Sequence, residues 1–220
     1  MAAPLSDQSA LQRLGVLVRK RLADDPTAYR VPVETAEIFA VGGFLDTSEC
    51  SHLIAMIDRV AKPSQVFDKE NFGTYRTSYS GDVDTGDSFI RMIERRLGDL
   101  LGIPLPWGET VQGQRYQPGQ EFQSHYDWFD TSAPYWPEEK RRGGQRSWTA
   151  MCYLNEVEEG GATTFDTLGI SIAPQAGALL IWNNARPDGS PNPDVIHAGT
   201  PVVKGVKYII TKGFRTRPWN

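Results

Sequence analysis

The second half of the chain is a series of short strand-like segments separated by turns. From Thr110 onward, segments rich in β-branched and aromatic residues alternate with clusters of Gly, Pro and Asp. Short strands at regular spacing, with turn residues between them, are typical of a sandwich or barrel built from strands. The pattern therefore predicts an all-β core over about residues 110–215, and the remaining segments have to pack around it.

Three amphipathic segments precede this core and predict helices. In residues 4–25 the apolar residues at helical spacing are Leu11, Leu14, Val18 and Leu22. The second helix begins at Asp46, a candidate N-cap with an acidic residue three positions later. The third covers residues 88–101, with an apolar stripe made of Phe89, Ile90, Ile93, Leu97 and Leu100. With a first strand over 38–44, we expect a mainly β, α+β fold whose helices support one outer face of a sheet.

Composition and charge are those of an ordinary globular protein. At 220 residues and 24.5 kDa, the chain is long enough for one domain with a substantial core. A net charge of −4 gives no reason to expect a nucleic acid or an anionic membrane as partner. No apolar run has the length of a transmembrane helix or of a signal core. Because Cys50 and Cys152 are far apart in sequence, we expect reduced thiols in a cytoplasmic protein.

A candidate metal site begins at His125, which is separated from Asp127 by one residue. In an extended strand, alternate side chains point to the same face, so these two would project into one space. The chain has three histidines. His52 is expected on a helix surface, whereas His197 follows a short apolar run. Two His and one carboxylate form the facial triad of non-haem Fe(II) oxygenases. Zinc is an alternative, although a structural zinc site normally has four protein ligands.

A lysine lies in the middle of a strand-like segment ten residues after His197. This residue, Lys207, is part of the β-branched and aromatic run 206–211, which predicts a buried strand. Burying an ammonium group is costly unless an anion meets it. Tyr116 is a candidate second donor to the same anion, and a metal beside a buried cation favours a chelating dicarboxylate. The alternative is an edge strand with Lys207 facing water.

The order of these residues resembles the prolyl 4-hydroxylase branch of the Fe(II)/2-oxoglutarate-dependent dioxygenases. The likeness rests on a His-x-Asp pair, a distant His and a Lys ten residues later. It extends over about residues 38–215, and the segments that look like this branch are 75–78, 115–122, 143–146, 152–155, 157–165, 178–183 and 197–205. One such segment could arise by chance, but the ordered series is specific.

The resemblance implies a single domain over residues 1–220. Its parts would be an N-terminal helical extension (1–37) and a catalytic core over about 110–215. That core would be a double-stranded β-helix, the jelly roll of cupin-like proteins, with the metal ligands in its open mouth. The cofactors implied are Fe(II), 2-oxoglutarate and O2, with ascorbate as reductant. The metal ligands implied are His125, Asp127 and His197.

The resemblance also assigns residues to the cosubstrate and the substrate. The far carboxylate of 2-oxoglutarate would meet Lys207, with Tyr116 and Thr163 as hydrogen-bond donors. Arg146 would lie near the substrate channel; its alternative is a surface Arg that ends a charged loop. The family often has Trp six residues after the Lys, where this chain has Gly213. This departure concerns the substrate side of the pocket, and it argues against importing a collagen-like specificity.

Three polar stretches are expected to be loops. Residues 62–87 suit a mobile loop over the mouth of an active site, or a plain surface loop. Residues 128–144 suit a surface insertion near the mouth, and 183–193 a second loop of this kind. Trp182 has apolar neighbours in sequence and is expected in the core.

Three functions remain open at this point. The first is hydroxylation of prolyl residues in a peptide or protein, with 2-oxoglutarate converted to succinate and CO2, as in a procollagen-proline 4-dioxygenase. The second is hydroxylation of free proline or another small metabolite at the same site. The third is a non-catalytic, cupin-like sensor of metal and 2-oxoglutarate. The complete set of ligands argues against the sensor.

Overall fold

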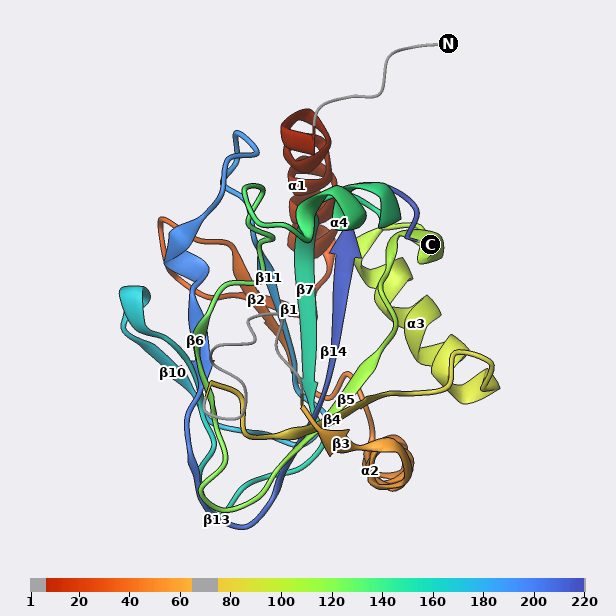
Figure 1. Cartoon of the computed structure of the whole chain (residues 1–220), viewed down its shortest axis with the longest axis vertical. Coiled ribbons are helices and arrows are strands. Elements are labelled where there is room, and N and C mark those ends of the chain that lie inside the picture. Colours follow the sequence, from red (N-terminus) through yellow and green to blue (C-terminus); the bar gives the residue numbers. More distant parts are fainter. Residues whose placement is uncertain (1–6, 65–74, 220) are drawn as a thin grey trace.

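Two antiparallel sheets that face each other form the core of the protein (Figure 1). The computed structural model describes residues 7–64 and 75–219. In this part of the chain, the large sheet has the spatial order β1 (Ala28–Arg30), β2 (Ile38–Val41), β11 (Leu179–Asn183), β7 (Arg146–Tyr153), β14 (Lys207–Arg215), β5 (Gln112–Tyr116), β4 (Tyr79–Asp82) and β3 (Lys62–Pro63). The small sheet has the order β10 (Ile170–Ile172), β9 (Thr163–Phe165), β12 (His197–Gly199) and β6 (Phe122–His125). The expected double-stranded β-helix is confirmed.

Short elements connect the strands of the two sheets. A ribbon of β8 (Glu159–Gly160) and β13 (Val202–Lys204) closes one end of the core. Single helical turns of 3-10 type, written η, lie in the connections, namely η2 (Leu105–Trp107), η3 (Asp166–Leu168) and η4 (Pro193–Val195). Among the described residues, no helix is long and apolar enough to cross a membrane.

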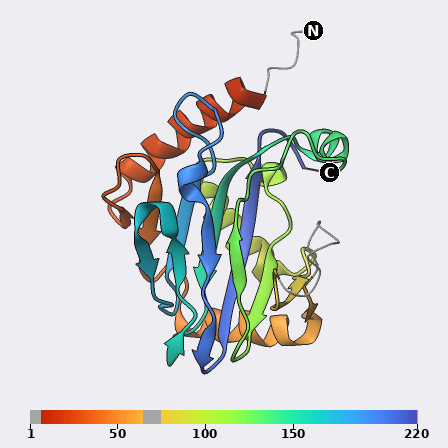
Figure 2. The same ribbon diagram turned by 60° about the vertical axis from the view of Figure 1, so that its left-hand side comes forward.

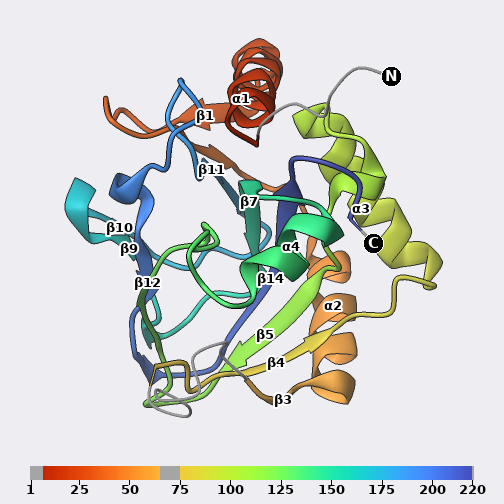
Figure 3. The ribbon, with the colours of Figure 1, turned by 45° about the horizontal axis from the view of Figure 1, so that its top comes forward.

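Three helices cover the outer face of the large sheet (Figure 3). They are α1 (Asp7–Asp24), α2 (Thr47–Val60) and α3 (Ser88–Leu101). The capping box expected at the start of α2 is present, because the Asp46 side chain accepts from the backbone N–H of Glu49 and the reciprocal bond also forms. Helix α3 ends at Gly102, whose φ of 69° is the left-handed conformation that favours glycine. The predicted layer of helices on one face is confirmed.

Side chains of each central strand point alternately to two buried faces. One face packs against the helices, and the other faces the space between the sheets, where the cavity lies. In β7, Trp148 and Cys152 pack with the helices, whereas Met151 and Tyr153 lie between the two sheets. In β11 the same alternation places Trp182 between the sheets, so the prediction that it is buried is confirmed. Strands that are buried on both sides read as continuous apolar runs. Period-two alternation then decides which side chains reach the functional site.

The loops differ from the expectations at three places. Part of the stretch 62–87 forms β3 and β4 at the edge of the large sheet, while residues 65–74 lie outside the described residues. The insertion 128–144 contains a short helix, α4 (Trp136–Arg142). The 183–193 loop is not wholly a surface loop, because Asn183 and Asn184 are buried. Their amides donate to Glu37 and Thr149, and these hydrogen bonds offset the cost of burying them.

Candidate metal centre and its cavity

The three predicted metal ligands meet at one end of the small sheet, where β6 and β12 pair. His125 ends β6 and His197 begins β12, and these two residues are opposite each other in the antiparallel register. One ligand atom from each of His125, Asp127 and His197 lies within 4.8 Å of the others. Figure 2 shows β12, in blue, beside the teal strands β9 and β10 of the same sheet. Two imidazoles and one carboxylate therefore converge from one side, as a facial triad requires.

Backbone carbonyls fix the orientation of both imidazole rings. The Nδ1 of His125 lies 2.9 Å from the carbonyl oxygen of Gln123, and the Nδ1 of His197 lies 3.0 Å from that of Val195. A carbonyl oxygen only accepts, so each Nδ1 carries a proton and each Nε2 keeps its lone pair for a metal. Burial, and the nearby His197, lower the pKa of His125 to about 3. His125 is therefore neutral at neutral pH, the form in which it coordinates a metal.

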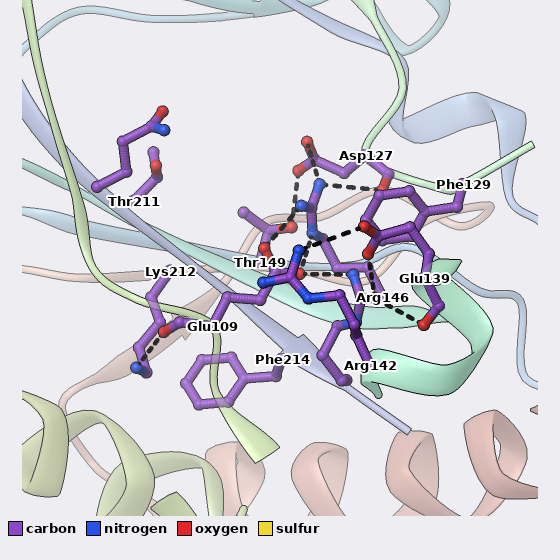
Figure 4. A network of polar contacts seen from close by, with 12 residues as sticks. Glu109, Asp127, Phe129, Glu139, Arg142, Arg146, Thr149, Thr211, Lys212 and Phe214 are labelled. Atoms are coloured by element: carbon purple, nitrogen blue, oxygen red, sulfur yellow. Dashed lines mark hydrogen bonds and ion pairs between the residues drawn. The ribbon is translucent and has the colours of Figure 1, made fainter. Parts of the chain in front are cut away.

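The carboxylate of Asp127 is held by two donors. The hydroxyl of Thr149 donates to one oxygen at 2.7 Å, and the Arg146 guanidinium donates to the other at 3.3 Å (Figure 4). Arg146 also donates to the backbone carbonyl of Asp127 at 3.1 Å. Burial opposes ionisation, but His197, Arg146 and His125 together lower the pKa of Asp127 to about 2. The carboxylate is thus ionised and oriented.

A cavity of about 750 Å³ extends from these ligands into the space between the sheets. Lys207 lies in its wall and is 2% exposed. Its Nζ lies 5.4 Å and 5.5 Å from the ring centroids of Tyr116 and Tyr153, and within the described chain no carboxylate pairs with it. Burial lowers the pKa of Lys207 to about 7. The prediction of a buried strand is confirmed, and the alternative of an exposed edge position is wrong, because β14 lies between β5 and β7.

Side chains that carry hydroxyl groups lie near Lys207. Tyr116 is the cross-strand neighbour of Lys207, and its hydroxyl donates to Gln114 at 2.7 Å. Thr163 is buried in β9, and its hydroxyl accepts from Tyr153 at 2.7 Å. Lys207, Tyr116, Gln114 and Thr163 line the cavity, whereas Tyr153 does not. The structure thus brings the predicted Lys207, Tyr116 and Thr163 together. Tyr153 was not predicted as a member of this group, although its segment was part of the resemblance.

Arg146 is engaged by carboxylates on both sides. It donates to the two oxygens of Glu109 at 2.9 Å and 2.8 Å, in addition to its contacts with Asp127. The alternative of a surface Arg is wrong, since Arg146 is only partly exposed and lines the cavity. Glu109 was missed, because it lies in a turn before the core and nothing near it in the sequence indicates a partner. Its side chain also accepts from Arg215 at 3.1 Å.

Another cation, Arg76, lies at the cavity. It donates to Gln112 at 2.8 Å, and its guanidinium lies 4.8 Å from the ring centroid of Phe122. Phe122 in turn stacks on His125 with a centroid distance of 3.6 Å. Arg76 belongs to the segment 75–78 that was expected to precede the core, and the structure places it against the metal centre. The apolar packing of the His125 ring restricts how far this ligand can turn.

Comparisons with known proteins agree with this geometry. Residues 111–215 match the family model described as 2OG-Fe(II) oxygenase superfamily. The chain is 35% identical to "Prolyl 4-hydroxylase 5" of Arabidopsis thaliana in an alignment 196 residues long, which covers 78% of this chain and 65% of that protein. It is 34% identical to "Probable prolyl 4-hydroxylase 8" of the same plant in an alignment 207 residues long, which covers 83% of this chain and 69% of that protein. The chain thus spans about two thirds of the length of these relatives.

A solved structure gives the same result for the fold. The viral collagen prolyl hydroxylase of Paramecium Bursaria Chlorella virus-1, in complex with 2-oxoglutarate, superposes with a TM-score of 0.64 at 29% identity. The match covers 81% of this chain and 95% of the viral one. Together with the plant relatives, it shows that the chain belongs to the prolyl 4-hydroxylase branch of the 2OG-Fe(II) oxygenase superfamily.

Proposed function

We propose that the protein hydroxylates prolyl residues of a peptide or protein, using Fe(II), 2-oxoglutarate and O2. The observation that carries the proposal is a facial triad that shares one cavity with a buried lysine, which pairs with no carboxylate of residues 7–64 and 75–219. The overall reaction is balanced when 2-oxoglutarate, O2 and a prolyl C–H group give succinate, CO2 and a hydroxyprolyl group. A non-catalytic sensor is disfavoured because the ligand set is complete.

The residues present fit an Fe(II) ion. His125 and His197 would each supply a neutral Nε2, and Asp127 an ionised oxygen, all from one side. When bound, iron supplies the activation of O2 that drives decarboxylation of the cosubstrate and insertion of one oxygen atom into a C–H bond. The protein keeps both imidazoles in the coordinating tautomer and holds the carboxylate through Thr149 and Arg146.

The cavity wall fits a dicarboxylate. Lys207 would form an ion pair with the far carboxylate of 2-oxoglutarate, and Tyr116 and Thr163 would donate hydrogen bonds to it. Such charge-assisted bonds are stronger in a cavity from which water is excluded. The ammonium lies 5.4 Å and 5.5 Å from the ring centroids of Tyr116 and Tyr153. A cation–π contact stabilises an ammonium group only modestly, so the site retains a strong preference for an anion.

The prolyl substrate is supported by the relatives, which are named prolyl 4-hydroxylases. Trp128, Phe129 and Tyr135 of the insertion 128–144 line the cavity that contains the metal ligands, and a peptide substrate would dock against them. Aromatic rings are the surfaces on which Pro-rich segments dock. Arg146 would lie beside the bound substrate at this side of the pocket, with its guanidinium held by Glu109 and Asp127. Free proline remains the second candidate.

Two further parts of the proposal concern the reductant and the location of the protein. We propose ascorbate as the reductant because the family resemblance implies it. We propose a cytoplasmic location because Cys50 and Cys152 are both buried and neither forms a disulfide.

The test is succinate formation with Fe(II), ascorbate and 2-oxoglutarate, in the presence of Pro-rich peptides or free proline. Mass spectrometry locates the added oxygen, and His125→Ala serves as the blank. Oxygen on a peptidyl proline is the expected result. Stimulation by free proline alone would instead assign the protein to the small-molecule hydroxylases. Binding of metal and 2-oxoglutarate without any turnover would favour a sensor.

A further inference from the structure

A chain of buried charged side chains connects helix α4 with the carboxylate of Asp127. Glu139 in α4 accepts from Arg215, and Arg215 donates to Glu109 at 3.1 Å. Glu109 accepts two hydrogen bonds from Arg146, at 2.9 Å and 2.8 Å. Arg146 then donates to the carboxylate and the carbonyl of Asp127. Figure 4 shows Arg146 between Glu109 and Asp127. Carboxylates and guanidiniums therefore alternate from the insertion to the metal site.

The geometry of this chain leaves Arg146 little freedom. Two parallel hydrogen bonds to Glu109 fix the plane of its guanidinium as well as its distance. Arg215, whose side chain is 1% exposed, holds the same Glu109 from the other side. Burial disfavours the charge of Glu109, but Arg146 and Arg215 lower its pKa below the ordinary value. Glu109 is thus an ionised link between two guanidiniums rather than a solvated surface acid.

Gly213 supplies the space that this link needs. A Cβ atom at this position would lie 2.5 Å from Nε of Arg146 and 2.7 Å from Oε1 of Glu109. Real Cβ atoms essentially never approach other atoms so closely. Any larger residue would therefore displace the ion pair. This explains the departure noted in the sequence: the Glu109–Arg146 pair occupies the volume beside Gly213.

We propose that Glu109 and Arg215 are positioning residues that hold the Arg146 guanidinium against Asp127. Through these two residues, the orientation of Asp127 depends on the position of helix α4. The insertion that contains α4 also contributes Phe129 and Tyr135 to the cavity wall. The guanidiniums of Arg146 and Arg215 lie 4.8 Å and 4.3 Å from the ring centroid of Phe129, so a substrate that moves this ring would act on the charged chain that orients Asp127. The inference rests on the proposed role of Asp127 as a metal ligand.

Two substitutions test this without removing a charge. Glu109→Asp keeps the carboxylate but withdraws it from Arg146 by one methylene group. Gly213→Ala changes no charged residue, and its Cβ would clash with the Glu109–Arg146 ion pair and displace it. The matched control is Glu49→Gln, which weakens another two-point pair with an arginine, Arg96, outside the cavity. Circular dichroism and thermal melting verify that each variant is folded.

The main readout is Co(II) binding, followed by isothermal titration and by the ligand-field absorption of the bound ion. Outer-shell partners of metal ligands typically contribute 10- to 100-fold in affinity, so we expect each folded variant to bind Co(II) about tenfold more weakly than the wild type. We also expect a changed Co(II) spectrum and fewer hydroxylations per succinate formed. Glu49→Gln should match the wild type in all three. A purely structural role would lower the melting temperature and leave the spectrum unchanged.

The outcomes separate this inference from the proposed function. Wild-type affinity and spectrum in a folded Gly213→Ala protein would overturn the inference while leaving the metal site intact. If Glu109→Asp does not fold, Gly213→Ala decides the question alone. Failure of the wild-type protein to bind Co(II) at all would instead contradict the proposed metal site.

Discussion

His197 in β12 lies directly opposite His125 in β6, with ring centroids 4.2 Å apart. The two histidines are far apart in sequence, and the register of one antiparallel strand pair makes them neighbours. Because side chains in a strand alternate, a slip of one residue would turn His197 away from the site. The metal centre therefore depends on the pairing of two short strands, each fixed by the larger fold around it.

Removing the Thr149 hydroxyl should weaken metal binding. Thr149→Val keeps the shape but deletes the donor to Asp127, and loss of a hydrogen bond to a metal ligand lowers metal affinity by about tenfold or more. Isothermal titration with Mn(II) measures the effect. The same hydroxyl accepts from Asn184, so the variant should also melt at a lower temperature. Thr27→Val, at an exposed hydroxyl far from the cavity, is the control. Unchanged Mn(II) affinity would contradict the role given to Thr149.

Lys207→Met should separate cosubstrate binding from metal binding. Without the ammonium, the far carboxylate of 2-oxoglutarate would be buried without a cation, which costs about 3 kcal/mol or roughly a hundredfold in affinity. The KM for 2-oxoglutarate should rise accordingly, while Mn(II) affinity stays unchanged. The ligand-free variant should also melt at a higher temperature, since it no longer buries an unpaired ammonium. Lys204→Met, at an exposed lysine of β13, is the control. An unaltered KM would exclude Lys207 from the cosubstrate site.

Binding of 2-oxoglutarate should weaken as the pH rises above 7. The pKa of Lys207 is lowered to about 7, so the ammonium is increasingly neutral in the free protein at higher pH. The dicarboxylate requires the charged form and therefore takes up a proton on binding, with a loss of up to about tenfold in affinity per pH unit. The Tyr116 and Tyr153 rings near the Nζ of Lys207 stay neutral in this range, because burial raises the pKa of both hydroxyls. Titration calorimetry in buffers of different ionisation enthalpy detects the proton. No uptake at pH 8 would contradict the prediction.

The lowered pKa of Lys207 also makes the stability of the ligand-free protein depend on pH. The lysine is protonated in the unfolded chain up to its ordinary pKa of 10.5, but in the folded protein only up to about 7. Between these values the unfolded state binds more protons, so the contribution of Lys207 to stability rises with pH. Lys207→Met should remove that part of the pH dependence, as measured by urea unfolding at a series of pH values.

The start of helix α3 offers a test of the fold that leaves the site alone. The Asp87 side chain accepts from the backbone N–H of Phe89 at 2.7 Å. Asp87→Ala should lower the free energy of unfolding by about 1 kcal/mol, since it leaves a helix N–H without its cap. Asp87→Ser, which keeps a capping oxygen, should restore most of the loss. Urea unfolding measures both variants, and turnover should match the wild type in each.

Local patterns in the sequence account for much of this structure. The capping box at Asp46 and the apolar stripe of 88–101 are properties of neighbouring residues, and the structure contains both helices. Alternation along a strand predicted that His125 and Asp127 project to one side. In the structure β6 ends at His125 and Asp127 follows in a bend, and the ligand atoms of both residues still converge with that of His197. Apolar periodicity and N-cap residues depend only on residues close together in the sequence, so they can be identified without knowing the fold.

Other features depend on contacts between distant segments. Glu109 meets Arg146 and Arg215 only after β7 and β14 have paired, and no local pattern around it predicts this. Asn184 looked like part of a polar surface loop, yet its amide is buried against Thr149. Gly213 could be recognised as a departure from the family. Its physical reason, a Cβ that would strike the ion pair, exists only in three dimensions.

The most direct test of the account is the anaerobic addition of Fe(II) and then 2-oxoglutarate to the folded protein. A visible charge-transfer band should appear when the cosubstrate chelates the metal, and it should be absent from His125→Ala. Lys207→Met should show the band only at much higher 2-oxoglutarate concentrations. A folded wild-type protein that binds Fe(II) but gives no band would contradict the claim that one cavity holds both the metal and 2-oxoglutarate.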